Sequence, residues 1–223
     1  MPINFKYTKN DNFFSQETPE SFYWAGFIAA DGCITEKLKN NKYFIRGLSL
    51  ELSILDIEHL QKFINAIEYT GDIKIYDKAA GRKSASLRIS SSIIINDLKK
   101  FNIVPRKSLI YTFPQLLIDH KLVNHFMRGY FDGDGSFFMK KETRGKDQLC
   151  MSICGTKEFL QEYVNILNKK CNIKLGNIIL DTKIHKIRCG GNTKTGKIRD
   201  YLYFDSNKNI YLDRKYNISH INI

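Results

Sequence analysis

The sequence predicts an α+β fold made of two pseudo-symmetric halves, each with the order helix, two strands, helix, two strands, helix. Three observations lead to this prediction: a repeat at a separation of about one hundred residues, an amphipathic helix pattern in each repeat, and short strand-like runs on both sides of that pattern. With 223 residues and 43% hydrophobic content, the chain is long enough for two halves that each bury a core.

The repeat is clearest in a segment that reads Gly, aromatic, apolar, any residue, small, Asp, Gly. It occurs at residues 26–32 and again at residues 129–135. The acids of the two copies, at positions 31 and 134, are 103 positions apart, and the glycines that precede the second strand pair, at 71 and 176, are 105 apart. The registers of the two halves therefore agree.

Local patterns place the remaining elements. Apolar residues near the spacing i, i+3, i+4 and i+7 predict helices at Asp56–Tyr69 and Lys157–Lys170. Alternating runs predict strands at Gly47–Leu52, Ile73–Tyr76, Ser86–Ser90, Gln148–Ile153, Asn177–Leu180, Lys186–Cys189 and Tyr201–Phe204. Polar stretches at 37–42 and 191–196 are expected to be hairpin loops. Pro105 and Pro114 bracket an extended join, so we expect an N-terminal half at residues 1–104, a linker at 105–118 and a C-terminal half at 119–223.

Small residues recur on one face of each repeated helix. They are four positions apart and therefore lie one turn apart on the same face. Because they carry little or no side chain, they allow two helix backbones to approach closely. The repeated helices are therefore expected to pack against each other about a pseudo-two-fold axis. The residues of this contact are Gly26, Ala30, Gly129 and Gly133.

Asp31 and Asp134 each fall at the C-terminal end of a repeated helix, and the glycine that follows each acid can turn the chain out of the helix. Pseudo-symmetry then brings two carboxylates together at the negative ends of two helix dipoles, an arrangement that a divalent cation would stabilise. Oxygen ligands without a nearby His or Cys suit Mg²⁺. The alternative is that both acids only cap the turns between helix and strand.

The chain is basic over its whole length. It carries 35 Lys and Arg against 23 Asp and Glu, which gives a formal net charge of +12. This balance favours a polyanionic partner contacted by a broad folded surface. Ribosomal proteins, membrane-surface proteins and other soluble proteins share such a charge, so it sets a direction without deciding the partner.

The repeated segments resemble the LAGLIDADG motif, whose nine positions correspond to residues 24–32 and 127–135. The chain is thus similar to the homing endonucleases that carry two copies of the motif in a single chain. This resemblance implies saddle-shaped antiparallel sheets that pack through the two motif helices and follow the major groove of double-stranded DNA. It further implies a monomer that acts in intron homing and hydrolyses phosphodiester bonds in both strands of a long asymmetric target.

The resemblance also implies a catalytic site. Asp31 and Asp134 would be the catalytic acids, and two or three Mg²⁺ ions would bind there, with Mn²⁺ and Ca²⁺ as substitutes. The residues expected at these ions are Asp31, Asp134, Ala30 and Gly133. The family also uses a basic residue late in each half, and Lys107 and Lys215 match it, 76 positions after residue 31 and 81 positions after residue 134. A lysine there can polarise the attacking water or stabilise charge on the phosphate.

Two positions depart from the motif. Position six is Ala29 in the first copy and Asp132 in the second, which leaves the catalytic acid at position eight in both copies. Arg128 replaces a small apolar residue, so its side chain must point outward or find a partner.

Alternation along the strands would send every second side chain to the DNA, where basic residues can contact base edges. The candidates for DNA binding are Arg46, Arg82, Arg88, Lys140, Arg144, Lys183, Lys186, Arg188 and Arg199. Contacts with phosphates are expected instead from Lys39, Lys42, Lys146, Lys197, Arg106 and Arg214.

Other functions remain open. The same fold resembles maturases, which bind intron RNA, and DNA-binding regulators that have lost the acids. Both acids are present here, which favours cleavage without excluding an added role on RNA. A basic structural protein with an accidental repeat is a more distant alternative.

The five cysteines are interpreted as reduced core residues, because they are odd in number and lack the CxxC pairing of zinc sites. No segment reaches the roughly 20 apolar residues of a membrane span, and no secretory signal is visible at the start. We therefore expect an intracellular protein without a membrane partner, in phage or bacterial cytoplasm or in an organelle.

Overall fold

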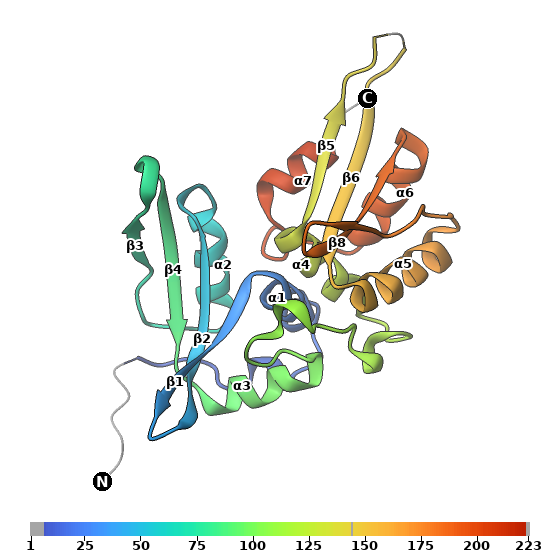
Figure 1. The fold of residues 1–223 in the computed structure, drawn as a ribbon. Helices are drawn as coiled ribbons and strands as arrows, with labels where there is room; N and C mark the ends of the chain where they lie inside the picture. Colours follow the sequence, from blue (N-terminus) through green and yellow to red (C-terminus); the bar gives the residue numbers. More distant parts are fainter. Residues whose placement is uncertain (1–6, 144, 222–223) are drawn as a thin grey trace.

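A computed structural model describes residues 7–143 and 145–221 of the chain. Within these residues, seven α-helices and eight strands form two halves that stand on either side of a central helix pair (Figure 1). None of the described helices combines the length and apolar character that crossing a membrane requires.

The N-terminal half has the predicted order of elements. These are α1 (Pro19–Asp31), β1 (Gly32–Lys39), β2 (Lys42–Ser53), α2 (Ile57–Ala66), β3 (Lys74–Asp77), β4 (Lys83–Ile89) and α3 (Ser92–Leu98). The four strands form one antiparallel sheet in the order β1-β2-β4-β3. Helix α2 packs on β2 and β4, which leaves the opposite face of the sheet open.

The C-terminal half repeats this plan and adds one helix. Its elements are α4 (Val123–Asp134), β5 (Gly135–Lys140), β6 (Gln148–Gly155), α5 (Lys157–Cys171), β7 (Ile179–Asp181), β8 (Ile184–Gly190), α6 (Asn192–Leu202) and α7 (Asp213–Ser219). Its sheet has the order β5-β6-β8-β7, equivalent to that of the first half. The predicted α+β fold with two pseudo-symmetric halves is therefore confirmed.

Helices α1 and α4 make the most extensive contact between helices in the described chain. Helix α1 begins with a capping box, in which Thr18 Oγ1 accepts from the Ser21 amide and Ser21 Oγ accepts from the Thr18 amide, and with Pro19 in its first turn. Nearly all of α1 is buried, because it lies between the two halves. It is consequently apolar on all sides instead of along one stripe.

Glycines allow the two backbones to touch. A Cβ on Gly26 would lie 2.0 Å from the Phe126 carbonyl oxygen, and a Cβ on Gly129 would lie 1.9 Å from the Tyr23 carbonyl oxygen. These distances are far inside van der Waals contact, so no other residue fits without moving a helix. The two contacts are equivalent, which gives the helix pair its pseudo-two-fold symmetry.

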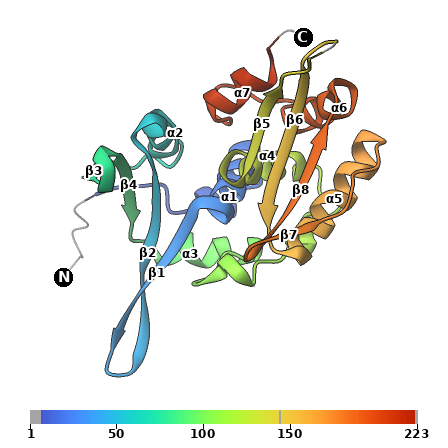
Figure 2. The ribbon, with the colours of Figure 1, turned by 45° about the horizontal axis from the view of Figure 1, so that its top comes forward.

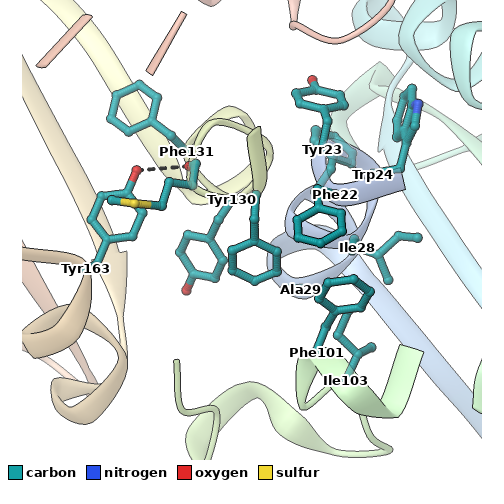
Figure 3. Close-up of a cluster of buried hydrophobic side chains, with 14 of the residues drawn as sticks. Phe22, Tyr23, Trp24, Ile28, Ala29, Phe101, Ile103, Tyr130, Phe131 and Tyr163 are labelled. Carbon is teal, nitrogen blue, oxygen red and sulfur yellow. Dashed lines mark hydrogen bonds between the residues drawn. The ribbon is translucent and has the colours of Figure 1, made fainter. Parts of the chain in front are cut away.

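Aromatic side chains surround the helix pair (Figure 3). Phe22 of α1 packs edge-on against Phe101, with ring centroids 5.4 Å apart. On the other side, the hydroxyl of Tyr163 donates to the Met127 carbonyl oxygen at 2.9 Å, drawn as a dashed line in Figure 3. One continuous core therefore runs through both halves.

A β-bulge redirects the long β1–β2 hairpin. Thr35 pairs with Gly47 and Glu36 pairs with Ile45, so Arg46 has no partner in the ladder. Gly47 has φ 155°, and a Cβ there would lie 2.4 Å from the Ile89 carbonyl oxygen. Beyond the bulge, the hairpin projects well away from the rest of its half (Figure 2).

Three local predictions were wrong. The polar stretch 191–196 is not a hairpin loop and Tyr201–Phe204 is not a strand, because both belong largely to α6 and the turn that follows it. Thr195, Ile198 and Leu202 are buried at helical spacing, and the tyrosines of this segment had suggested a strand. The cysteines are free, as expected, but Cys33 is exposed and Cys154 is only partly buried.

Candidate active site

Asp31 and Asp134 are the last residues of α1 and α4, and solvent reaches both residues although the surrounding protein removes much of the water near their carboxylates. Asp134 borders a cleft of about 260 Å³ at the ends of the two helices. Lining residues from both halves include Ala29, Ala30, Lys107, Tyr111, Tyr130 and Thr156. The helix pair thus brings the two acids of the repeat into one site between the sheets.

The glycines around the acids provide room. A Cβ on Gly133 would lie 2.3 Å from the Ala30 Cβ and 3.3 Å from Asp31 Oδ2. Gly32 and Gly135 turn the chain out of the helices in extended conformations, with φ −82° and −97°. They are needed for space, because a Cβ on Gly32 would lie 2.7 Å from the Ile28 carbonyl oxygen.

The two acids repel each other. The surrounding protein and the charge of Asp134 raise the pKa of Asp31 from 3.8 to about 6, against the opposing charges of Lys215, Lys107 and Arg214. Burial also raises the pKa of Asp134. A cation between the carboxylates would relieve this repulsion.

The surroundings of the two acids differ. The Tyr130 hydroxyl, which donates to the Cys154 carbonyl oxygen at 3.2 Å, also lies close enough to Asp134 to lower the pKa of that acid and partly offset the effect of burial. Phe27 occupies the equivalent place, four residues before Asp31, and offers no hydrogen bond. Sequence reasoning missed Tyr130, although a residue four positions before an acid in a helix lies on the same face.

Lys107 and Lys215 are both buried, at 5% and 4% exposure, and their charges act on both acids. The Lys107 ammonium donates to the Gly32 carbonyl oxygen at 2.8 Å. The Lys215 ammonium donates to the carbonyl oxygens of Phe131, Asp132 and Gly133 in the last turn of α4. Burial lowers the pKa of Lys215 to about 8. Each lysine therefore binds backbone at the end of a motif helix, next to the acids.

The adjacent arginines are engaged with carboxylates. Arg106 contacts Glu36 at 3.2 Å and stacks on the ring of Tyr43 at 4.2 Å. Arg214 forms a two-pronged ion pair with Asp56, at 2.9 and 3.1 Å. Their expected role in binding phosphate would require these pairs to open.

Two arginines occupy equivalent places on the open faces of the sheets. Cys33, Ser49 and Arg88 share one row across β1, β2 and β4. Ser136, Ser152 and Arg188 share the corresponding row across β5, β6 and β8. Both arginines are exposed, and each row starts two residues after a motif acid. This places one basic side chain on each side of the acids.

Most other candidates for DNA binding are also accessible. Arg46 is exposed at the bulge, Lys140 is exposed beside Glu142, and Lys186 is half-buried and paired with Asp181. The turns between β3 and β4 and between β7 and β8 carry Arg82 and Lys183, both exposed. Arg144 lies outside the described residues.

The prediction for Arg199 requires correction. Arg199 lies on α6, which covers the face of the sheet away from the open one, and its guanidinium donates to the Ser219 carbonyl oxygen at 3.1 Å. It had been expected among the DNA-binding residues, just before a predicted strand at Tyr201–Phe204, but this part of the chain is α6 and the turn that follows it. Lys197 lies on the same helix.

The donors present at the site fit a divalent metal that keeps most of its water. Two carboxylates lie near enough for the charge of one to act on the other, and the described residues contain no cluster of three or more His, Cys, Asp and Glu that could enclose an ion. Mg²⁺ binds in this way, through one or two carboxylates with water and phosphate oxygens as the remaining ligands. Of the other two expected residues, Gly133 presents its carbonyl oxygen to Lys215, and Ala30 lies against Gly133.

A first prediction concerns stability without metal. Asp31 has a folded pKa above its unfolded value, so its charge weakens the fold at pH values above about 6 and not below about 4. Asp31→Asn should therefore raise the free energy of unfolding in EDTA at pH 7, and this gain should vanish at pH 4. Urea denaturation at both pH values measures it, and a gain that does not change with pH would contradict the explanation.

Solved structures share this architecture. The homing endonuclease I-GzeII in complex with its DNA target superposes with a TM-score of 0.56 and 15% identity over 92% of this chain and 90% of that chain. The meganuclease I-AabMI bound to uncleaved DNA gives 0.54 and 12% identity over 83% of each chain. I-SmaMI bound to uncleaved DNA in the presence of calcium ions gives 0.50 and 14% identity over 84% of each chain.

These likenesses define the fold class: the chain has the two-domain fold of the LAGLIDADG homing endonucleases. The motif helices of the resemblance correspond to α1 and α4. No protein-family model matches the sequence, and no curated protein matches it.

Proposed function

We propose that this chain is a site-specific endonuclease that hydrolyses phosphodiester bonds in both strands of double-stranded DNA with the help of a divalent metal. One observation carries the proposal: two exposed carboxylates, Asp31 and Asp134, meet at the ends of two tightly packed helices with Lys107 and Lys215 beside them. If Asp31 and Asp134 served only to end the two helices, placing two like charges near each other would bring no benefit to the fold.

The acids would hold the metal, and the two lysines would keep positive charge next to the phosphate backbone. When bound, a divalent ion neutralises charge on the phosphate and makes its bound water more acidic. Lys107 and Lys215 are fixed by hydrogen bonds to backbone, so their charges need little reorganisation when DNA arrives. One chain carries both acids, and we therefore propose that it acts as a monomer.

The open faces of the two sheets would bind the DNA. Arg88 and Arg188 lie nearest to the acids and are expected to contact bases near the centre of the target, whereas Arg46, Arg82, Lys140 and Lys183 lie further out. Because the two sheets differ in sequence, the target is expected to be long and asymmetric. The likeness to structures with bound DNA supports this assignment of the surface.

The proposal is tested by incubating the chain with a large pool of randomised duplex DNA and Mg²⁺, then capturing and sequencing the cut ends. We expect one family of long asymmetric sites, cut in both strands with Mg²⁺ and uncut in EDTA. Enrichment of bound DNA without cutting would favour a DNA-binding protein. Selective binding of intron RNA without cutting would favour a maturase.

A further inference from the structure

Helix α7 belongs to the C-terminal half but is held by the N-terminal half as well. It lies on the side of its half that faces α2 (Figures 1 and 2). It is the element without a counterpart in the repeat, since the equivalent place after α3 holds only short 3-10 turns. Helix α7 also carries Lys215, so whatever holds it determines where that ammonium lies.

The contacts with the N-terminal half are two ion pairs, here called the α7 brace. Arg214 contacts Asp56 through two nitrogens, and the Asp56 side chain is only 11% exposed. Lys62 of α2 contacts Asp213 at 2.7 Å and also donates to the Tyr211 carbonyl oxygen at 3.1 Å. A two-nitrogen contact such as that of Arg214 with Asp56 fixes the orientation of both side chains more firmly than a single exposed ion pair does.

The C-terminal half holds the other side of α7 through Asp132. This carboxylate is 1% exposed and accepts hydrogen bonds from the Leu212 amide at 2.8 Å, the Tyr203 hydroxyl at 3.0 Å and the Tyr23 hydroxyl at 2.8 Å. Leu212 directly precedes α7. These buried contacts hold the segment before α7 to the C-terminal half, and the brace orients the helix that follows it.

Lys107 is supported differently. Its neighbour Arg106 contacts Glu36 and Tyr43, which both belong to the N-terminal half. Lys107 itself binds the carbonyl oxygen of Gly32 in that half. The polar contacts of Lys107 and Arg106 are thus made within the N-terminal half, whereas the helix that carries Lys215 is held by both halves.

We propose that Asp56, the acid of the brace that pairs with Arg214, is a positioning residue for Lys215, through which the N-terminal half controls the chemistry that depends on that lysine. The inference rests on the proposed nuclease function. Loss of the brace leaves the fold and Lys107 in place and displaces α7. The DNA strand whose cleavage needs Lys215 is then cut slowly, and DNA with a cut in only one strand accumulates.

The test breaks the Arg214–Asp56 pair of the brace and then rebuilds it with reversed charges. Asp56→Arg, Arg214→Asp and the milder Arg214→Gln each remove the pair, whereas the double variant Asp56→Arg with Arg214→Asp restores it. Cleavage of a supercoiled plasmid that carries the selected target separates the first cut from the second. We expect each single variant to slow the second cut by on the order of tenfold to a hundredfold, and the double variant to recover it.

A matched control removes an ion pair elsewhere. Asp119→Arg breaks the exposed pair with Lys169, which lies 3.2 Å away, and should leave the ratio of the two cuts unchanged. Single variants that cut both strands in the normal ratio, or a double variant that stays slow, would overturn the proposal.

Hydrogen exchange in the DNA-free protein gives a readout that does not need cleavage. Amides of residues 213–219 should exchange faster in the single variants and recover in the double variant, with no change in Asp119→Arg. If the unmodified chain never cuts DNA, the nuclease proposal fails, and this measurement still decides whether the brace holds α7. Unchanged exchange in the single variants would show that it does not.

Discussion

Cleavage of both strands should fall by at least about a thousandfold when Asp31 or Asp134 is replaced by Asn, while binding to the target persists. Each substitution removes one of the two carboxylate charges that interact at the ends of α1 and α4. It changes no atom of the helix contact and keeps the shape of the side chain. Single-turnover cleavage with Mg²⁺, with target binding measured in Ca²⁺, separates the two effects.

The control is Asp119→Asn, an exposed acid in a pair with Lys169, which should cut at the unmodified rate. The two active-site variants are expected to differ in residual rate, because the Tyr130 hydroxyl lowers the pKa of Asp134 and Phe27 stands in the equivalent place near Asp31. An Asn variant that cuts as fast as the unmodified chain would show that the acids have only a structural role at the C-terminal ends of α1 and α4.

The parts of the site that the sequence predicted are those that occur in both copies of the repeat. The repeated pattern predicted the helix pair, because glycine four positions from a small residue has a simple geometric meaning. It also located both acids at helix ends, since each acid precedes the glycine at which a strand begins. Repetition thus turned two modest local signals into a prediction of three-dimensional proximity.

The parts that could not be predicted depend on contacts between distant segments. Sequence placed Lys215 near the acid but not its three carbonyl partners in α4, because this requires the path of residues 203–212. Arg128 illustrates the same limit. It is fully buried, and its guanidinium donates to the carbonyl oxygens of Leu202 and Ile210 and to His125 Nδ1.

Those buried contacts explain why the two copies of the motif differ at positions two and six. Asp132 and Arg128 both bind the segment that leads to α7, which the first half lacks. Ala29 therefore has nothing equivalent to bind. The single Tyr23 proton goes to Asp132, so His59 Nε2, 3.0 Å from the same hydroxyl, must carry its own proton. This chain of polar groups joins α2, α1 and α4 inside the core.

The largest loss of stability is expected at the helix contact. Gly129→Ala would place a Cβ 1.9 Å from the Tyr23 carbonyl oxygen, and Gly26→Ala would place one 2.0 Å from the Phe126 carbonyl oxygen. In both cases the obstacle is backbone, which cannot rotate away as a side chain can, so the helices must separate along their length. Each variant should lose about 3 kcal/mol or more of the free energy of unfolding, measured by urea denaturation.

Gly196→Ala is the matched control, because Gly196 lies within α6 and the only atom near its Cβ position is Arg199 Nη2 at 3.9 Å. The same substitution there should raise stability by roughly 0.5–1 kcal/mol, since alanine favours the helix. A loss at Gly129 no greater than about 1 kcal/mol would mean that the helices can part at little cost. The acids could then not be held together by the packing of α1 on α4, and their proximity would need another cause.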